Sequence, residues 1–140
     1  MKLMEIMRKG SDVVTCSSSD FVTDAAKKMK EHNVGCILIT EQGNLKGILT
    51  DRDIALTVVA EGKPAGDIRL QDIMRTNVVT GKPDWDIFEA TRIMSEKRVR
   101  RLPIASNGKL EGYVSLSDIA PAIQKEVDSF LELERPPLAL

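Results

Sequence analysis

The sequence has few of the residues that metal centres use. Its 140 residues include two cysteines, Cys16 and Cys36, and one histidine, His32. Two cysteines that form no C-x-x-C pair, together with one histidine, cannot supply the four ligands of a structural zinc site. We therefore predict a chain with reduced thiols, no metal site and no required cofactor.

An excess of charge and a long apolar run are also missing. Lysine and arginine number 20 against 21 aspartates and glutamates, so the formal net charge is −1 and no global field attracts nucleic acid or an anionic membrane. The N-terminal stretch Met1-Lys2-Leu3-Met4-Glu5 carries charges and does not reach the apolar run of a signal peptide or a membrane span. We expect a cytoplasmic protein that binds neither membrane nor nucleic acid.

The motifs of common enzyme classes are absent as well. The sequence has no G-x-S-x-G motif and no P-loop, and His32 stands alone at the predicted end of a helix. We expect no catalytic residues and no enzymatic activity.

What the sequence does contain is an internal repeat with a spacing of 65 residues. Between positions 13 and 55, 14 of 43 residues recur identically 65 positions later, where average composition would give only about three. The stretch Thr50-Asp51-Arg52-Asp53 falls on Ser115-Leu116-Ser117-Asp118. The chain is therefore a duplication, and we expect both halves to fold in the same way.

Each half begins with a short β-branched run and continues into a hairpin. Val13-Val14-Thr15 and Val78-Val79-Thr80 are too brief for helices and predict short strands. Two strands around a glycine-containing turn are predicted next in each half, over residues 36–50 and 102–115. Pro103 cannot donate a hydrogen bond to a neighbouring strand, so its strand should lie at a sheet edge or begin there.

An amphipathic helix is predicted after the short strand of each half, over about residues 21–29 and 86–94. Asp86 matches the N-cap of the second of these helices. Phe21 stands at the equivalent place in the first helix, where we expect Ser19 or Asp20 to provide the cap instead.

A further helix is predicted after each hairpin, over about residues 52–60 and 117–133, and Pro136-Pro137 stops the last one. The repeated unit is thus β-α-β-β-α. We divide the chain into a first motif with a short N-terminal helix, a linker, a second motif, and the end of the last helix with a tail: residues 1–62, 63–69, 70–128 and 129–140.

This ordered set of motifs resembles a tandem pair of CBS motifs, also called a Bateman module. The resemblance rests on G-x-x-T-D-R-D-I in one copy, G-x-x-S-x-S-D-I in the other, V-R-R-L-P-I before the second hairpin, and Asp72-Ile73-Met74. It spans about residues 3 to 125. It implies an α/β (α+β) disc in which two motifs are related by a pseudo-twofold axis, pack through their sheets and leave two clefts.

The resemblance also implies roles for the residues that follow each hairpin. Asp53 and Asp118 match the family's ribose-binding acid, and Thr50 and Ser115 match its hydroxyl partner. A carboxylate held there can accept both ribose hydroxyl protons, while hydroxyl and backbone N–H groups meet a phosphate. The alternative is an ordinary capping box, which the same [ST]-x-x-D spacing favours.

Basic residues near the start of the second hairpin match those that reach phosphates in the family: Arg98, Arg100 and Arg101. Arg52 and Ser117 are further candidates for phosphate. The first copy has Asn33, Gly35 and Cys36 in place of the three arginines, so we expect two clefts that are not equivalent. The alternative for the arginines is a set of solvated charges after a helix, and Arg52 could instead pair with Asp51 or another surface acid.

The resemblance places adenine against the short strands and hairpins, where our candidates are Val13, Val14, Thr15, Ile37, Val78, Val79, Thr80 and Leu102. Each of these residues could instead be simple core. Tyr113 and Trp85 could stack on a base or fill gaps.

The resemblance implies a regulatory, energy-sensing protein that binds an adenine-containing small molecule and signals to a separate protein partner. AMP, ADP and ATP are the expected ligands, with S-adenosylmethionine and NAD as alternatives. A homodimer is expected because members of the family pair through amphipathic helices. A structural dimerisation module without a ligand remains the alternative.

Overall fold

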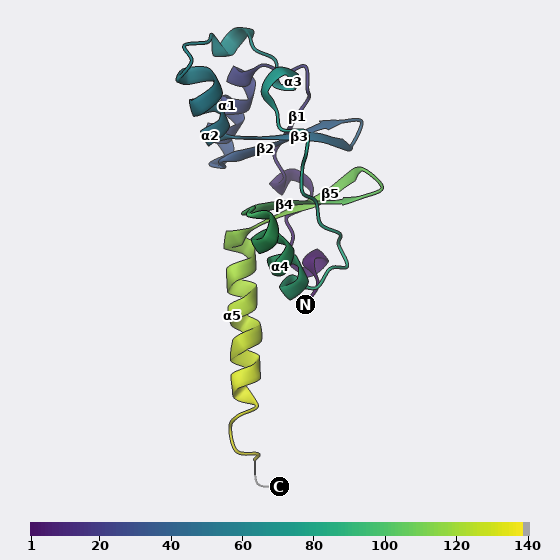
Figure 1. Ribbon diagram of the computed structural model, residues 1–140. Coiled ribbons are helices and arrows are strands. Elements are labelled where there is room, and N and C mark those ends of the chain that lie inside the picture. The colour runs from purple at the N-terminus through teal and green to yellow at the C-terminus, as the bar shows by residue number, and fades with distance from the viewer. Residues whose placement is uncertain (139–140) are drawn as a thin grey trace.

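The structure, a computed structural model, describes residues 1–138 and contains the duplicated unit (Figure 1). In the first half, a short strand and a helix precede a hairpin and a second helix: β1 Thr15–Cys16, α1 Val22–His32, β2 Cys36–Glu41, β3 Asn44–Thr50 and α2 Asp51–Ile54. The helix α2 continues as a π-helical turn over Ala55–Val59. The second half contains α4 Ile87–Lys97, β4 Arg101–Ser106, β5 Lys109–Ser115 and α5 Leu116–Glu132. This arrangement confirms the predicted fold class.

Two local predictions were wrong. No strand forms over Val78–Thr80, and the second copy keeps only an isolated parallel bridge between Gly81 and Ile104. The N-cap of α1 is Phe21 and not a polar residue before it, because the Asp24 carboxylate accepts a hydrogen bond from the Phe21 N–H at 2.8 Å. The predicted cap of α4 is confirmed, since the Asp86 side chain accepts from the Phe88 N–H at 2.9 Å.

The two hairpins join into one sheet of five strands, in the order β1-β2-β3-β5-β4. Their strands pair at the tips of the hairpins, where Asn44 pairs with Lys109, and the two turns exchange backbone hydrogen bonds. The predicted glycine-containing turns are confirmed, and each is a two-residue turn with positive φ, Gln42-Gly43 in one hairpin and Asn107-Gly108 in the other. The strand that contains Pro103, β4, lies at the sheet edge and so confirms the expectation from its missing N–H.

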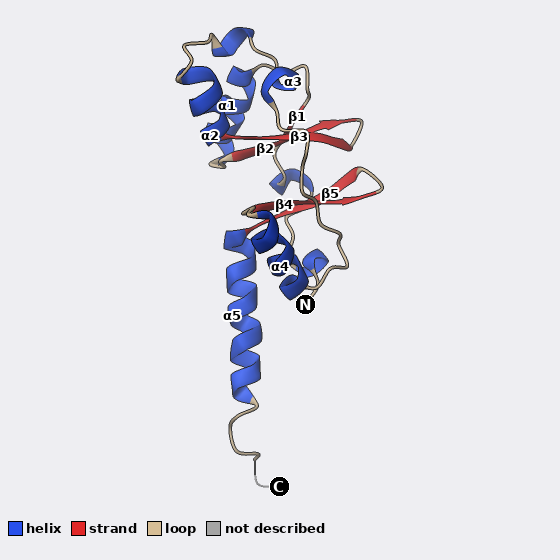
Figure 2. Cartoon of the chain, in the orientation of Figure 1, coloured by secondary structure: helices blue, strands red, loops and turns tan. Residues whose placement is uncertain are grey.

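In each half, the helices lie beside the hairpin (Figure 2), and the buried apolar side chains of each half form a separate hydrophobic core. Met29 and Met94 lie in these cores, as their helical spacing predicted. Because side chains alternate along a strand, one face of each hairpin packs on the helices and the other faces the opposite hairpin. The clefts described below lie on this second face.

The short segment that precedes each half in the chain packs on the other half. Residues 1–8, which we term the first lead segment, pack on the second half, and Leu3 is fully buried in the core there. Residues 70–75, the second lead segment, which begins with the short helix α3 Leu70–Ile73, pack on the first half, where Leu70 is fully buried. Each half is therefore completed by a segment that precedes the other half in the chain.

Each lead segment crosses a hairpin strand at a glycine. Arg75 exchanges two backbone hydrogen bonds of 2.9 Å with Ile48 on β3, and Arg8 exchanges bonds of 2.8 and 3.1 Å with Tyr113 on β5. A Cβ atom at Gly47 would lie 2.7 Å from the Met74 Sδ and 2.9 Å from the Arg75 carbonyl oxygen. A Cβ at the repeat-related Gly112 would meet Met7 and Arg8 just as closely. Glycine is therefore required at both crossings.

The helix α5 extends well beyond the rest of the second half (Figure 1). It ends at Glu132, one residue before the predicted end, and the final part of the predicted tail, residues 139–140, lies outside the described residues. None of the helices that the structure describes combines the length and the apolar character needed to cross a bilayer.

We predict that Gly47→Ala lowers the free energy of unfolding by about 1–3 kcal/mol, because the added methyl group must push the second lead segment off β3. Chemical denaturation checks this value. Gly66→Ala is the matched control, since nothing lies within 4 Å of a Cβ there. Equal stability of the Gly47→Ala variant and the wild-type protein would show that the crossing is not tightly packed.

Candidate functional site

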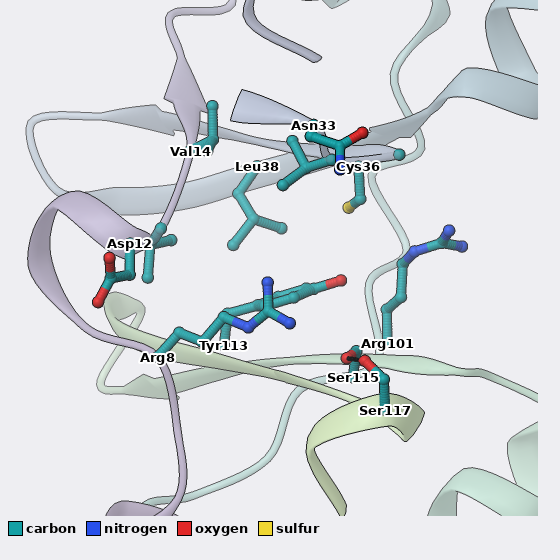
Figure 3. A pocket seen from close by; sticks show the side chains of 13 residues that line it. Arg8, Asp12, Val14, Asn33, Cys36, Leu38, Arg101, Tyr113, Ser115 and Ser117 are labelled. Atoms are coloured by element: carbon teal, nitrogen blue, oxygen red, sulfur yellow. Dashed lines mark hydrogen bonds between the residues drawn. The ribbon is translucent and has the colours of Figure 1, made fainter. Parts of the chain in front are cut away.

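Two pockets lie between the hairpin faces, each built from both halves. Cleft 1 has a volume of about 220 Å³, with Val13, Val14 and Leu38 from the first half and Tyr113, Ser115 and Ser117 from the second (Figure 3). Cleft 2 has a volume of about 330 Å³, with Val78, Val79 and Pro103 from the second half and Ile48, Thr50 and Arg52 from the first. Positions 65 residues apart take equivalent places in the two clefts, as a pseudo-twofold arrangement requires.

The predicted adenine residues separate into two groups. Val13, Val14, Val78 and Val79 line the clefts, whereas Thr15 and Thr80 do not. Ile37 and Leu102 are fully buried in the helix-side cores, so their selection as cleft residues was wrong. Strand alternation turns the next residue of each strand toward the other hairpin, and Leu38 and Pro103 line the clefts instead.

The two predicted ribose acids cap helices. An oxygen of Asp53 accepts from the Thr50 N–H at 3.0 Å, and the Asp53 N–H donates to the Thr50 Oγ1 at 3.1 Å, which forms a capping box. In the second half, an oxygen of Asp118 accepts from the Ser115 N–H at 2.9 Å. The capping role is therefore present in the structure, and it uses one oxygen of each carboxylate.

The other oxygen of each acid is held by an arginine from a lead segment. Arg75 donates to the Asp53 Oδ1 from its Nη2 at 2.6 Å and from its Nε at 3.0 Å. Arg8 donates to the Asp118 Oδ1 from its Nη2 at 3.0 Å, and its Nε donates to both carboxylate oxygens at 3.2 Å. Both arginines line a cleft, whereas neither acid does. Each guanidinium thus stands between its acid and the cleft.

Sequence reasoning missed these two arginines. Their signal is a second alignment of the repeat, in which Leu3-x-x-Ile6-Met7-Arg8 matches Leu70-x-x-Ile73-Met74-Arg75 at a spacing of 67 residues. The first copy has two more residues between this segment and its short strand, and this difference breaks the 65-residue register.

The ion pair with Arg75 keeps Asp53 charged although its side chain is only 8% exposed. Burial is the largest single effect on Asp53 and raises its pKa, but the hydrogen bonds from Arg75 and Thr50 and the charge of Arg75 together outweigh it and hold the pKa below its ordinary value. The hydrogen bond to Asp53 in turn raises the pKa of Arg75. A carboxylate at this position therefore depends on a cationic or hydrogen-bonding partner.

The two clefts differ strongly in charge. Cleft 2 is lined by five arginines and no acidic side chain: Arg52, Arg75, Arg98, Arg100 and Arg101. Cleft 1 is lined by two arginines, Arg8 and Arg101, and by Asp12. Among residues 1–138, no ion pair involves Arg52, Arg98, Arg100 or Arg101, so the predicted alternative of a pair between Arg52 and Asp51 does not form.

Cleft 1 has a neutral wall where cleft 2 has cations. Cys36 lies at the position of Arg101 in the repeat, and burial, the largest effect, raises the pKa of its thiol to about 11 although the charge of Arg101 opposes it. Burial also raises the pKa of Tyr113, which faces the same cleft (Figure 3). Both groups are uncharged at neutral pH, so this thiol is a poor nucleophile.

No metal site appears in the described part of the chain. Within residues 1–138, no three histidine, cysteine, aspartate or glutamate side chains gather closely enough to hold a metal ion.

Comparison with known proteins decides the family. The family model for the CBS domain matches the chain twice, over residues 3–69 and 70–125. The chain belongs to the CBS-domain family. It is thus a CBS pair of the regulatory type, a class of modules that are generally not catalytic.

Relatives and solved structures agree with this family. The CBS domain-containing protein YhcV of Bacillus subtilis is 43% identical over 110 residues, which cover 79% of this chain and 78% of that protein. The crystal structure of the CBS-domain containing protein ATU1752 from Agrobacterium tumefaciens has a TM-score of 0.77 and 29% identity, and covers 88% of this chain and 99% of that one. A hexameric CBS-CP12 protein from bloom-forming cyanobacteria has a TM-score of 0.73 and 32% identity, and covers 86% of this chain and 69% of that one.

One cleft 2 arginine has a strained backbone. Arg98 adopts a left-handed conformation with φ of 55°, and Asn33, a residue that tolerates this region well, adopts φ of 53° at the equivalent place. We predict that Arg98→Asn raises the free energy of unfolding by about 1 kcal/mol while it weakens anion binding in cleft 2. Denaturation and triphosphate titration check the two effects. An Arg98→Asn variant that is less stable than wild type would contradict this account of the strain.

Proposed function

We propose that this CBS pair binds adenine nucleotides, with cleft 2 as the principal site. The observation that carries the proposal is the convergence of five arginines on one pocket that also has an apolar wall and a hydroxyl group. Arginine is suited to bidentate recognition of phosphate, and several guanidinium groups without carboxylate partners need an anion to offset their mutual repulsion.

Each part of a nucleotide has a matching surface in cleft 2. Val78, Val79 and Pro103 offer an apolar wall for the base, and Thr50 offers a hydroxyl near the ribose acid Asp53. Arg52, Arg98 and Arg100 are exposed and available to phosphate oxygens. This charge favours ligands with several phosphate groups, ADP and ATP, over AMP, and NAD over S-adenosylmethionine, which carries no phosphate.

Cleft 1 has the same plan but fewer cations. Asp12 and the uncharged pair Cys36 and Tyr113 lower its attraction for phosphate. We infer that cleft 1 binds adenine nucleotides more weakly than cleft 2. A ligand in cleft 2 contacts both halves, so its binding can change how the two halves present their helices to a separate protein partner. This coupling is the proposed route from metabolite to regulation in the cytoplasm.

We predict that ATP stabilises the wild-type protein against heat, with about 2.7 kcal/mol gained at 100 times the dissociation constant. A panel of AMP, ADP, ATP, NAD and S-adenosylmethionine tests the ligand class in thermal-shift measurements. Asp53→Ala should weaken ATP binding by on the order of tenfold to a hundredfold, because it removes the acid for the ribose hydroxyls.

Asp118→Ala is the matched control for this panel. It removes the same capping contact from the other half, and it should leave most of the ATP effect in place. A flat response of the wild-type protein to every ligand would overturn the proposal and favour a structural dimerisation module without a ligand.

We also propose that the chain forms a homodimer through α5. Apolar side chains on this helix and on the neighbouring α4 are exposed around one groove, lined by Phe88, Val127, Phe130 and Leu133 among others. Phe130 is 65% exposed and Leu133 is 81% exposed. Such a surface favours a partner, and a second copy of the chain supplies the same apolar surface. The hexameric CBS-CP12 relative shows that self-association occurs in the family.

We predict that Phe130→Glu weakens this dimer by at least on the order of tenfold, because it places a charge inside the apolar contact. Light scattering after size-exclusion chromatography gives the mass at several concentrations. Gln124→Glu, which adds the same charge on a different face of α5, should leave the dimer intact. A wild-type protein that stays monomeric at high concentration would rule out the homodimer.

A further inference from the structure

The carboxylate that we assign to ribose is not free to receive it. Asp53 does not line cleft 2, and its Oδ1 accepts two hydrogen bonds from Arg75. Its Oδ2 is occupied by the Thr50 N–H. A ribose diol that approaches Asp53 must therefore first remove the guanidinium of Arg75 from this oxygen.

Displacement of Arg75 from Asp53 by the ribose of a nucleoside is unfavourable. The two hydroxyl groups of ribose are neutral, and they would replace a charge-assisted, two-bond contact to a carboxylate that is only 8% exposed. The displaced guanidinium would also lose its anionic partner. An adenosine molecule without phosphate supplies nothing in cleft 2 that compensates for either loss.

A nucleotide supplies the missing partner. The Arg75 side chain is 69% exposed and lines cleft 2, where a phosphate group would lie among the other arginines. Its backbone is held to Ile48 by two hydrogen bonds of 2.9 Å, so the guanidinium can swing about a fixed Cα atom. The exchange would leave Arg75 paired with phosphate and Asp53 hydrogen-bonded to the ribose hydroxyls.

We propose that Arg75 makes cleft 2 selective for nucleotides over nucleosides. Its guanidinium occupies the carboxylate of Asp53, the proposed ribose acid, until a phosphate group binds the guanidinium in its place. This inference rests on the proposed function, and it assigns specificity to a residue that the family resemblance did not select. Since Arg75 belongs to the second lead segment, nucleotide binding also changes the contact between this segment and the first half.

The test compares adenosine with ATP, without divalent cations, by isothermal titration of the full chain. For the wild-type protein we expect much tighter binding of ATP than of adenosine. Arg75→Met should change the two affinities in opposite directions, each by on the order of tenfold: adenosine binds more tightly because Asp53 is open, and ATP binds more weakly because a phosphate ligand is lost. Arg75→Lys, which keeps the charge with fewer donors, should restore part of the preference for ATP.

Arg8→Met is the matched control, because it removes the equivalent arginine from Asp118 in cleft 1. It should leave ATP binding in cleft 2 unchanged. If Arg75→Met weakens adenosine and ATP to the same extent, or alters neither, the inference is overturned while nucleotide binding stands. If the wild-type protein binds neither compound, the proposed function itself is wrong and the inference falls with it.

Discussion

The structure depends on two short lead segments, each of which packs on the half that it does not precede in the chain. Each lead segment buries a leucine in the core of the other half and crosses its hairpin so closely that only glycine fits beneath it. Because of this crossing, the backbone of Arg75 lies beside β3 and the backbone of Arg8 beside β5, within reach of Asp53 and Asp118. Neither half can keep both its core and its paired acid without the segment that precedes the other half.

Duplication followed by divergence explains why the two clefts differ. The apolar walls and the acid with its hydroxyl partner are shared by both copies, whereas Arg52, Arg98 and Arg100 of cleft 2 are replaced in cleft 1 by Ser117, Asn33 and Gly35. Gly35 and Arg100 occupy equivalent places, as do Cys36 and Arg101. One copy thus combines cations with a strained backbone at Arg98, and the other keeps a relaxed backbone at Asn33 and a neutral wall. One cleft therefore gathers arginines without an acidic lining residue, and the other has fewer arginines and one acid.

The sequence predicted the features that local chemistry controls. The glycine-containing turns predicted both hairpins, and Pro103 predicted an edge strand. The helical spacing of Met29 and Met94 predicted that both lie in the cores. It could not tell which face of a strand looks into the cleft, and so selected Ile37 where Leu38 lines it. The arginines on the acids were missed because Arg8 and Asp118 are 110 positions apart, and no local pattern links them.

The position of the Arg75 guanidinium in a nucleotide complex tests the central claim most directly. A crystal structure of the full chain with ATP should show the ribose hydroxyls on Asp53 and the guanidinium turned toward phosphate, while the backbone of Arg75 stays paired with Ile48. A complex in which ATP occupies cleft 2 and Arg75 still binds Asp53 would contradict the account, because the acid would then be only a helix cap.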